Sequence, residues 1–228
     1  MALIDDIVLN EKTRQEYFPV ASERVYMAHA GVCVIPKVAG DAMRDFATAS
    51  ELDNQESDEH MAIAEDARTL AAELIGAQAL EIALLGPTSV GLSLVANGLD
   101  WNDVDEVVSY ADDYPANVYP WTNLVSRGVK HVPLVPDQPG VIDWDLIEPL
   151  LTPKTRLVAL ASCHFLSGYR IDIDTIGKNL HDRGILFCLD GIQTIGVFHT
   201  SVEHVDFLSA DSHKWMLGPA ASGIFFVR

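Results

Sequence analysis

The sequence predicts an α/β fold, a three-layer sandwich built around a seven-stranded and mostly parallel sheet. Short apolar runs alternate with helix-compatible segments along most of the chain, as they do in βαβ proteins. The central runs LVALAS and ILFCLD are continuously apolar, which is typical of strands that helices cover on both faces. The chain has 228 residues, of which 49% are hydrophobic, so it is long enough to bury one large core.

The predicted strands are seven runs of apolar and β-branched residues bounded by turn-forming residues. They cover residues 82–85, 106–110, 130–134, 157–162, 185–190, 206–210 and 223–228. We expect the last strand to run antiparallel to the others.

The predicted helices lie between these runs and before the first of them. Four segments between the strands are compatible with helices: 89–97, 116–126, 143–150 and 174–183, the last with a stop at Gly184. Residues 38–74 are rich in Ala, Glu and Asp with apolar residues at helical spacing, which predicts one or two helices packed outside the sheet.

The chain is expected to divide near residue 75. Residues 1–75 would form an N-terminal arm and helices packed on the large domain, and residues 76–228 would form the large α/β domain. Within the first part, the acidic stretch 51–59 predicts a solvated loop, with contact to a partner as the alternative.

The composition excludes several classes of protein. The formal net charge of -18 would repel a nucleic-acid backbone and an anionic membrane surface. The longest uncharged run, residues 82–99, contains Gly, Pro, Ser and Asn, so we read it as a strand, a turn and a helix and not as a membrane span.

The three cysteines are too few and too scattered for a disulfide framework or a zinc site, so no metal is predicted. The N-terminus lacks the basic patch and apolar run of a signal peptide, and a cytoplasmic protein is expected.

The segment SADSHKWMLGP, residues 209–219, places Lys214 in a turn between His213 and Trp215, directly after a predicted strand. Desolvation favours the neutral amine of a lysine and makes it nucleophilic. Lys214 is therefore a candidate for Schiff-base chemistry. The alternative is an ordinary lysine at a strand end whose amine reaches solvent.

Asp190 ends the predicted strand 185–190, and open α/β sheets place ligand-binding groups at the carboxyl ends of their strands. One strand separates this acid from Lys214, so both groups should lie at the same edge of the sheet. Pyridoxal phosphate needs such a pair, a carboxylate that keeps its pyridine nitrogen protonated and an amine that holds its aldehyde. The alternative is that Asp190 caps the next helix.

The segment LLGPTSVGLSLVA puts Gly86, Thr88 and Ser89 between a predicted strand and the start of a helix. Free backbone N–H groups and hydroxyls at such a position can hold a phosphate. A simple capping role for Thr88 or Ser89 is the alternative. The chain has neither a Walker A loop nor a GxGxxG fingerprint.

Taken together, the ordered segments PTSVG, DYPANVYPW, SCHFLSGYR, LDGIQ and SHKW resemble the class V aminotransferase superfamily of fold-type I pyridoxal-phosphate enzymes. This superfamily includes cysteine desulfurases and kynureninase-like and isopenicillin-epimerase-like proteins. The resemblance extends over nearly the whole chain. It implies pyridoxal 5′-phosphate as cofactor, an amino acid as substrate, and a homodimer whose two subunits share each active site.

The resemblance also implies roles for individual residues. Lys214 would carry the Schiff base and move protons, and Asp190 would pair with the pyridine nitrogen. The other implied cofactor contacts are Gln193 at the phenolic oxygen and, at the phosphate, Thr88, Ser89, His213 and Ser212.

Three further implied positions surround the cofactor ring. Tyr114 would stack on the ring where desulfurases keep a histidine, because stacking needs only a flat π face. His164 would lie near the ring as a catalytic residue, and a core histidine is its alternative. The loop Ala28, His29, Ala30 and Gly31 would face the substrate.

The chain departs from the superfamily pattern in two ways. Asp211 stands where many relatives have a serine on the phosphate, and its carboxylate should repel that group unless it points away. In the superfamily a second domain follows the last strand, whereas this sequence stops at Arg228, so we read it as the large domain of a longer architecture. None of Cys33, Cys163 and Cys188 matches the sulfur-accepting cysteine of desulfurases.

The predicted function is that of a pyridoxal-phosphate enzyme of the class V aminotransferase type, acting on an amino acid through Lys214. The alternatives are a cofactor-binding domain without independent activity, a relative of the cysteine desulfurases or lyases, and a sugar- or nucleotide-binding module. The sequence leaves transamination, racemisation, desulfuration and elimination open.

Overall fold

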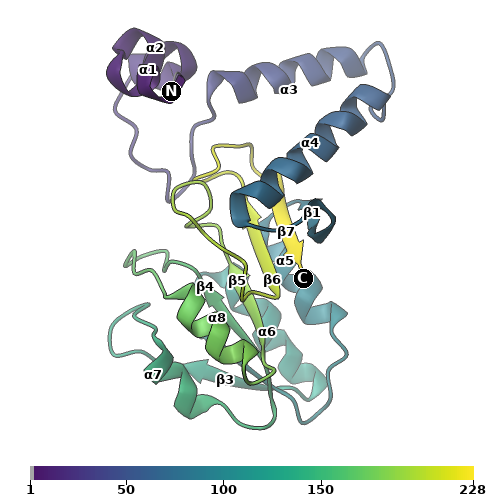
Figure 1. Ribbon diagram of the computed structural model, residues 1–228, viewed down its shortest axis with the longest axis vertical. Coiled ribbons are helices and arrows are strands. Elements are labelled where there is room, and N and C mark those ends of the chain that lie inside the picture. The colour runs from purple at the N-terminus through teal and green to yellow at the C-terminus, as the bar shows by residue number, and fades with distance from the viewer. Residues whose placement is uncertain (1–2) are drawn as a thin grey trace.

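The seven strands of the computed structural model, which describes residues 3–228, form one sheet with the order β1-β7-β6-β5-β4-β2-β3 (Figure 1). They are β1 (Ile82–Leu85), β2 (Glu106–Tyr110), β3 (Lys130–Leu134), β4 (Thr155–Ala161), β5 (Leu186–Asp190), β6 (Phe207–Asp211) and β7 (Gly223–Val227). All pairs are parallel except those of β7, which runs antiparallel to both β1 and β6. The predicted fold class and the antiparallel last strand are confirmed, and the strand ends differ from the predicted ones by at most two residues.

The helices of the sheet region are α5 (Thr88–Gly98), α6 (Tyr119–Asn123), α7 (Trp144–Ile147) and α8 (Ile173–His181). Two predicted helices are wrong as single elements. Segment 116–126 divides into a 3-10 turn at Pro115–Asn117, α6 and a second 3-10 turn at Leu124–Arg127, and segment 143–150 divides into α7 and the 3-10 turn Glu148–Leu150. Pro115, Pro120 and Pro149 explain the breaks, because proline lacks the N–H group that a continuing helix requires.

Helices cover both faces of the sheet. One apolar cluster joins α4, α7 and α8 to one face, and a second joins α5 and α6 to the other. Adjacent residues of β5 contribute to different clusters: Phe187 belongs to the first cluster and Cys188 to the second. Strand β5 is therefore apolar throughout because both of its faces are covered.

The N-terminal part consists of α1 (Leu3–Leu9), α2 (Glu11–Tyr17), α3 (Lys37–Ser50) and α4 (Asp58–Ile75), with short 3-10 turns at Pro19–Ser22 and Ala79–Glu81. Helix α4 adds Ala71, Ala72 and Ile75 to the core, whereas α2 and α3 bury no residue. In Figure 1, α1 and α2 lie at the far end of the molecule from α7. The predicted acidic loop joins α3 to α4, and its last two residues begin α4 after the N-cap Ser57.

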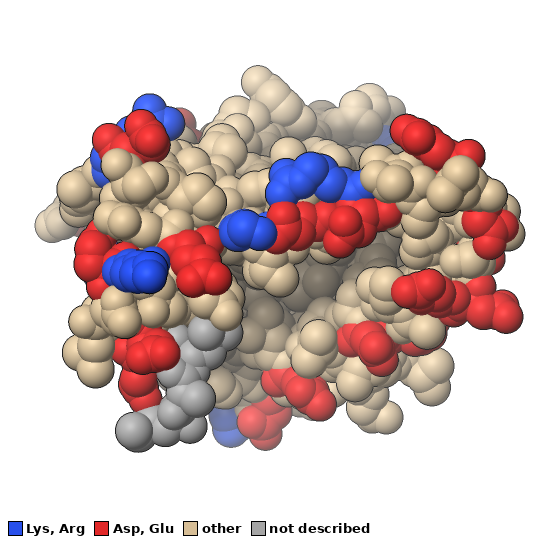
Figure 2. Space-filling view, turned by 90° about the horizontal axis from the view of Figure 1, so that it is seen from above, with Lys and Arg blue, Asp and Glu red and all other residues tan. Residues whose placement is uncertain are grey.

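Acidic side chains dominate the face seen from above in Figure 2, where they surround a hollow and the fewer basic side chains lie beside them. Among residues 3–228, no helix combines the length and the apolar character that crossing a membrane requires.

Gly91 allows α5 to lie directly against β6. A Cβ atom on this residue would lie 2.3 Å from Ser209 Oγ and 2.8 Å from Ser209 Cβ. We expect Gly91→Ala to lower the free energy of unfolding by about 1–3 kcal/mol, because the added methyl group overpacks a buried interface. Urea unfolding measures this loss.

Gly98 provides a matched control at the end of the same helix, since no atom lies within 4 Å of its ideal Cβ position. Gly98→Ala should leave stability unchanged or raise it by up to about 1 kcal/mol, as helix propensity predicts. Equal effects of the two substitutions would contradict this account of the α5–β6 contact.

Candidate active site

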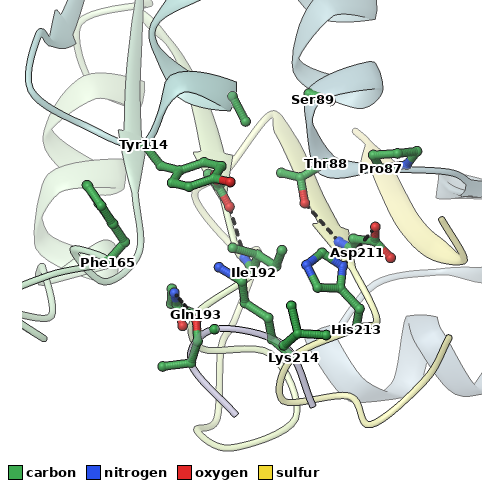
Figure 3. Close-up of a pocket in the computed structure, with 15 residues that line it drawn as sticks. Pro87, Thr88, Ser89, Tyr114, Phe165, Ile192, Gln193, Asp211, His213 and Lys214 are labelled. Atoms are coloured by element: carbon green, nitrogen blue, oxygen red, sulfur yellow. Dashed lines mark hydrogen bonds and ion pairs between the residues drawn. The ribbon is translucent and has the colours of Figure 1, made fainter. Parts of the chain in front are cut away.

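A cavity of about 500 Å³ opens at the carboxyl ends of β5 and β6, next to the first turn of α5 (Figure 3). The strand register brings these ends together, because Asp190 of β5 pairs with Ala161 of β4 and with Ser209 of β6. The residues that line it are Ala30, Gly31, Val32, Pro87, Thr88, Ser89, Tyr114, Ala116, Phe165, Asp190, Ile192, Gln193, Asp211, His213 and Lys214. Most of the residues expected from the sequence to form a site therefore meet in one cavity.

Lys214 is buried in this cavity with only 7% of its surface exposed. Its amine makes no hydrogen bond or ion pair within residues 3–228, and it lies over the ring of Tyr114, whose centroid is 5.4 Å from Nζ. Burial lowers the pKa of this amine, and the charges of Asp190 and Asp211 offset part of the effect. A lysine in this environment is a better nucleophile than one in water, because more of it is neutral.

Asp190 lies in the same cavity and is 3% exposed. Its Oδ1 accepts a hydrogen bond of 3.0 Å from the backbone N–H of Ile192. Burial raises the pKa of this carboxyl to about 7, helped by the charge of Asp113 and opposed by Ile192 and Lys214. A cationic N–H group bound beside it would return Asp190 to its ionised form, since an opposite charge favours the carboxylate.

The other end of the cavity offers donors for an anion. Thr88 and Ser89 begin α5, and their hydroxyls and the helix N-terminus border the cavity. The Thr88 hydroxyl accepts a hydrogen bond of 2.9 Å from Asp211 N–H, which leaves its own proton free to donate (Figure 3). His213 also lines this end.

Asp211 is the unfavourable group at the anion end, because its carboxylate also borders the cavity. Three backbone N–H groups donate to this carboxylate, those of Ser212, Ala221 and Ser222 at 2.7, 3.1 and 3.3 Å. His213 Nδ1 lies 3.0 Å from it, at an angle that makes no hydrogen bond. These hydrogen bonds from its own loop partly neutralise the negative charge of Asp211. They therefore reduce the repulsion between this carboxylate and a bound phosphate that the sequence predicts.

Gln193 links the N-terminal segment to the cavity. Its side-chain amide donates to the carbonyl of Ala30 at 3.0 Å, and its carbonyl accepts from the indole N–H of Trp215 at 3.0 Å. A second connection runs from Cys33 N–H to the carbonyl of His213 at 2.6 Å. The loop around residue 30 thus closes one side of the cavity, although it is far from the sheet in the sequence.

Four residues expected at the site do not line the cavity. Ser212 donates its hydroxyl proton to the carbonyl of Pro219, so it faces its own loop. His164 packs behind the wall against Phe165 and Tyr110, and His29 stacks on Trp215. Ala28 also lies outside, and of its predicted loop only Ala30 and Gly31 border the cavity. These residues are close to site residues in the sequence, but that closeness does not determine whether a side chain points into the cavity or away from it.

Three residues at or near the site, Phe165, Ile192 and Asp113, are not among those expected from the sequence. Phe165 and Ile192 are lining residues, and Phe165 meets Tyr114 edge to face with 5.5 Å between ring centroids. Asp113 lies outside the cavity wall and is almost fully buried. Its signal was an acid shortly after the carboxyl end of a predicted strand, the same signal that identified Asp190. No group of three or more His, Cys, Asp or Glu side chains suited to a metal ion occurs within residues 3–228.

The stability of the ligand-free protein should fall as the pH rises toward 7. In the unfolded chain the Asp190 carboxyl loses its proton near the ordinary pKa of 3.8, whereas in the folded protein the pKa is about 7. Between these values the unfolded state binds fewer protons, so the free energy of unfolding decreases with pH. We expect a loss of about 2–4 kcal/mol from this group.

Asp190→Asn should remove that loss, because the amide does not titrate. Urea unfolding of both proteins at pH 5 and pH 8 measures the difference. Parallel pH profiles for the two proteins would show that Asp190 ionises in its ordinary range.

Comparison with protein families gives a match to the aminotransferase class-V family over residues 25–228. Among curated proteins, the probable cysteine desulfurase of Methanothermobacter thermautotrophicus is 33% identical over 164 residues. That alignment covers 71% of this chain and 41% of the relative. The aligned part of the chain therefore spans less than half the length of this relative.

Solved structures share the fold. The apo structure of the cysteine desulfurase from Thermococcus onnurineus NA1 superposes with a TM-score of 0.83 at 24% identity, covering 96% of this chain and 57% of that one. A mutant of C-DES with glycine covalently linked to its PLP cofactor superposes with a TM-score of 0.85 at 21% identity, covering 94% and 59%.

Proposed function

Because the chain belongs to the class-V aminotransferase family, we propose that its cavity binds pyridoxal 5′-phosphate and that the protein acts on an amino acid. One observation carries this proposal. The amine of Lys214 and the carboxyl of Asp190 are both buried in the same cavity, since Asp190 ends β5 and Lys214 follows the adjacent strand β6. No hydrogen bond or ion pair joins the two groups within residues 3–228. Buried ionisable groups without a complete set of partners are unfavourable unless a ligand supplies what is missing.

The residues present fit each part of this cofactor. The cavity has a nucleophilic amine for the aldehyde, a carboxyl for the pyridine nitrogen, and hydroxyl and backbone donors for the phosphate. His213 Nδ1 is buried without a hydrogen bond within residues 3–228, so it can take part at the phosphate end. When bound, the cofactor supplies an electron-withdrawing ring that weakens the bonds to the α-carbon of an attached amino acid.

The protein side of the mechanism follows from the positions of these groups. Lys214 would hold the aldehyde carbon covalently, and its neutral amine would accept and return protons once the substrate displaces it. Asp190 would hold a proton on the pyridine nitrogen. The ring of Tyr114 would limit the movement of the cofactor and exclude water from the side next to Lys214.

Three groups would complete the binding of the cofactor. Thr88 and Ser89 would donate to the phosphate from the start of α5, as the free proton of the Thr88 hydroxyl allows. Gln193 keeps a second amide N–H for the phenolic oxygen, since only one is used by Ala30.

Among the four reactions that the sequence leaves open, the names of the relatives favour a lyase-type reaction over transamination. The relative described above is named a probable cysteine desulfurase, and a related structure is that of a cystine C–S lyase. We therefore propose cleavage of a carbon–sulfur bond in a cysteine-like amino acid as the reaction. A homodimer and a division near residue 75 also stay proposals.

Reconstitution of the purified protein with pyridoxal 5′-phosphate tests the binding. After borohydride reduction, mass spectrometry of the peptides should find the cofactor on Lys214. Labelling at other lysines alone, or none, would overturn the proposal.

The reaction is tested by incubating the reconstituted protein with L-cysteine, L-cystine and, in parallel, with L-alanine and an oxo acid. Release of sulfide or persulfide from the sulfur amino acids supports the lyase. Exchange of the amino group without sulfur release supports transamination instead. Cofactor binding without product from any of these amino acids supports a binding domain that lacks independent activity.

A further inference from the structure

A second and much smaller cavity lies behind the wall of the candidate site. Its volume is about 10 Å³, which is close to the smallest space that holds one water molecule. The residues around it are Tyr110, Asp113, Gly140, Ile142, Ala161, His164 and Ile171. Two of these, Asp113 and His164, carry polar side chains that are almost completely buried, at 7% and 5% exposure.

The hydrogen bonds of His164 determine which ring nitrogen carries the proton. The backbone N–H of Ser167 donates to Nδ1 at 3.2 Å, so Nδ1 is an acceptor and the proton lies on Nε2. Nε2 is buried and has no hydrogen-bond partner within residues 3–228. A buried donor without an acceptor is unfavourable, and this nitrogen belongs to a ring that borders the small cavity.

Asp113 borders the same cavity and can accept further hydrogen bonds. Its Oδ1 accepts from Tyr114 N–H at 2.7 Å, and its Oδ2 accepts from the side-chain amide of Asn117 at 3.0 Å. A carboxylate has about four acceptor positions, so two contacts do not saturate it. A water in the cavity could accept from His164 and donate to Asp113, and both groups would then be satisfied.

The same carboxylate fixes the backbone on which Tyr114 stands. Asp113 holds the N–H of Tyr114, and the backbone N–H of Asn117 donates to the Tyr114 carbonyl at 2.8 Å. The Asn117 side chain is itself fixed, because its carbonyl accepts from the indole N–H of Trp121 at 2.9 Å. Both peptide groups of Tyr114 are therefore held from inside the protein, and its ring faces the cavity near Lys214 (Figure 3).

We propose that the small cavity binds one structural water between His164 and Asp113, and that Asp113 is a positioning residue that holds the Tyr114 ring over Lys214. The positioning role rests on the proposed function, whereas the water site does not. Asp113 also acts on the site through its charge, which contributes to the raised pKa of Asp190. His164, predicted as a catalytic residue, would thus act from behind the wall and not on the reacting atoms.

A crystal structure of the protein at high resolution tests the water site directly. We expect one ordered water within hydrogen-bonding distance of both His164 Nε2 and the Asp113 carboxylate. An empty cavity, or an Nε2 atom bonded to a protein group, overturns this part of the proposal. The measurement requires neither the cofactor nor a variant.

The coupling between the charges of Asp113 and Asp190 is tested by Asp113→Asn, with Asp112→Asn as the matched control. Asp112 carries the same charge on the same loop but is exposed. In the protein without cofactor, carbon-13 NMR should show the apparent pKa of Asp190 falling by about one pH unit in Asp113→Asn and not in Asp112→Asn. No change in either variant overturns the coupling.

In the protein with cofactor, Asp113→Asn should weaken the binding of pyridoxal 5′-phosphate about tenfold, which corresponds to losing one charge-assisted hydrogen bond. If this variant does not fold, His164→Phe, which keeps an aromatic side chain but removes both ring nitrogens and with them the Nε2–H donor, should weaken binding in the same direction. Unchanged affinity in the folded variants overturns the positioning role. If the wild-type protein binds no cofactor, the proposed function fails. The crystal structure then still tests the water site, and the titration of Asp190 still tests its coupling to Asp113.

Discussion

Replacement of Lys214 by alanine should abolish the covalent retention of pyridoxal 5′-phosphate after borohydride reduction. The amine of Lys214 is the only lysine nitrogen among the groups that line the main cavity within residues 3–228, and burial lowers its pKa. No other side chain there can form the carbon–nitrogen bond that borohydride makes permanent. Any turnover of an amino acid should fall by about 10²–10⁴-fold or more, because the same amine moves the protons.

Lys12→Ala is the control for this prediction, since Lys12 is exposed on α2 and outside the cavity. It should keep the full label and the full turnover. The absorbance of the bound cofactor gives an independent readout, because Lys214→Ala should show the spectrum of the free aldehyde. Covalent label that persists in Lys214→Ala would remove this lysine from the mechanism.

Replacement of Asp190 by asparagine should have the second largest effect. The amide cannot hold a proton on the pyridine nitrogen, so the electron-withdrawing power of the ring decreases. We expect turnover to fall by about 10²–10³-fold, as it does when one preorganised electrostatic contact at a reacting group is lost. The label on Lys214 should persist, which distinguishes this variant from Lys214→Ala.

Asp206→Asn is the matched control for Asp190→Asn. Asp206 precedes β6 at the opposite edge of the sheet, where its carboxylate accepts from Phe187 N–H at 2.8 Å. The asparagine can keep that hydrogen bond through its carbonyl, so the substitution removes the charge and with it the 3.9 Å ion pair between Asp206 and Arg228. Equal losses of turnover in the two variants would show that the effect of Asp190→Asn comes from the stability of the sheet and not from the site.

The alternation of apolar runs and helical segments was sufficient to predict the sheet, because strands covered on both faces need apolar residues at every position. The predicted helices were wrong where proline interrupts them, since periodicity alone does not register a missing N–H at Pro120 or Pro149. Residues 38–74 gave two helices, α3 and α4, but only α4 reaches the core.

At the site, the sequence identified the residues whose position follows from a strand end. Asp190, Lys214, Thr88 and Ser89 each adjoin the carboxyl end of a strand or the start of the helix that follows one, and all of them line the main cavity. His164 and Ser212 are also close to strand ends, yet their side chains point into their own loops. The direction of a loop side chain depends on hydrogen bonds made within the fold, which no spacing in the sequence records.

The sequence by itself determined the fold class, the edge of the sheet at which the site lies, and the pair of Lys214 and Asp190 that indicates the cofactor. These follow from local patterns, because the order and direction of strands place their ends at one edge. Only the tertiary structure showed that Asp113 and His164 border a small buried cavity outside the main one, and that the loop at Ala30 closes the main cavity. Those relations join residues far apart in the chain, and they depend on packing and burial, which exist only once the chain has folded.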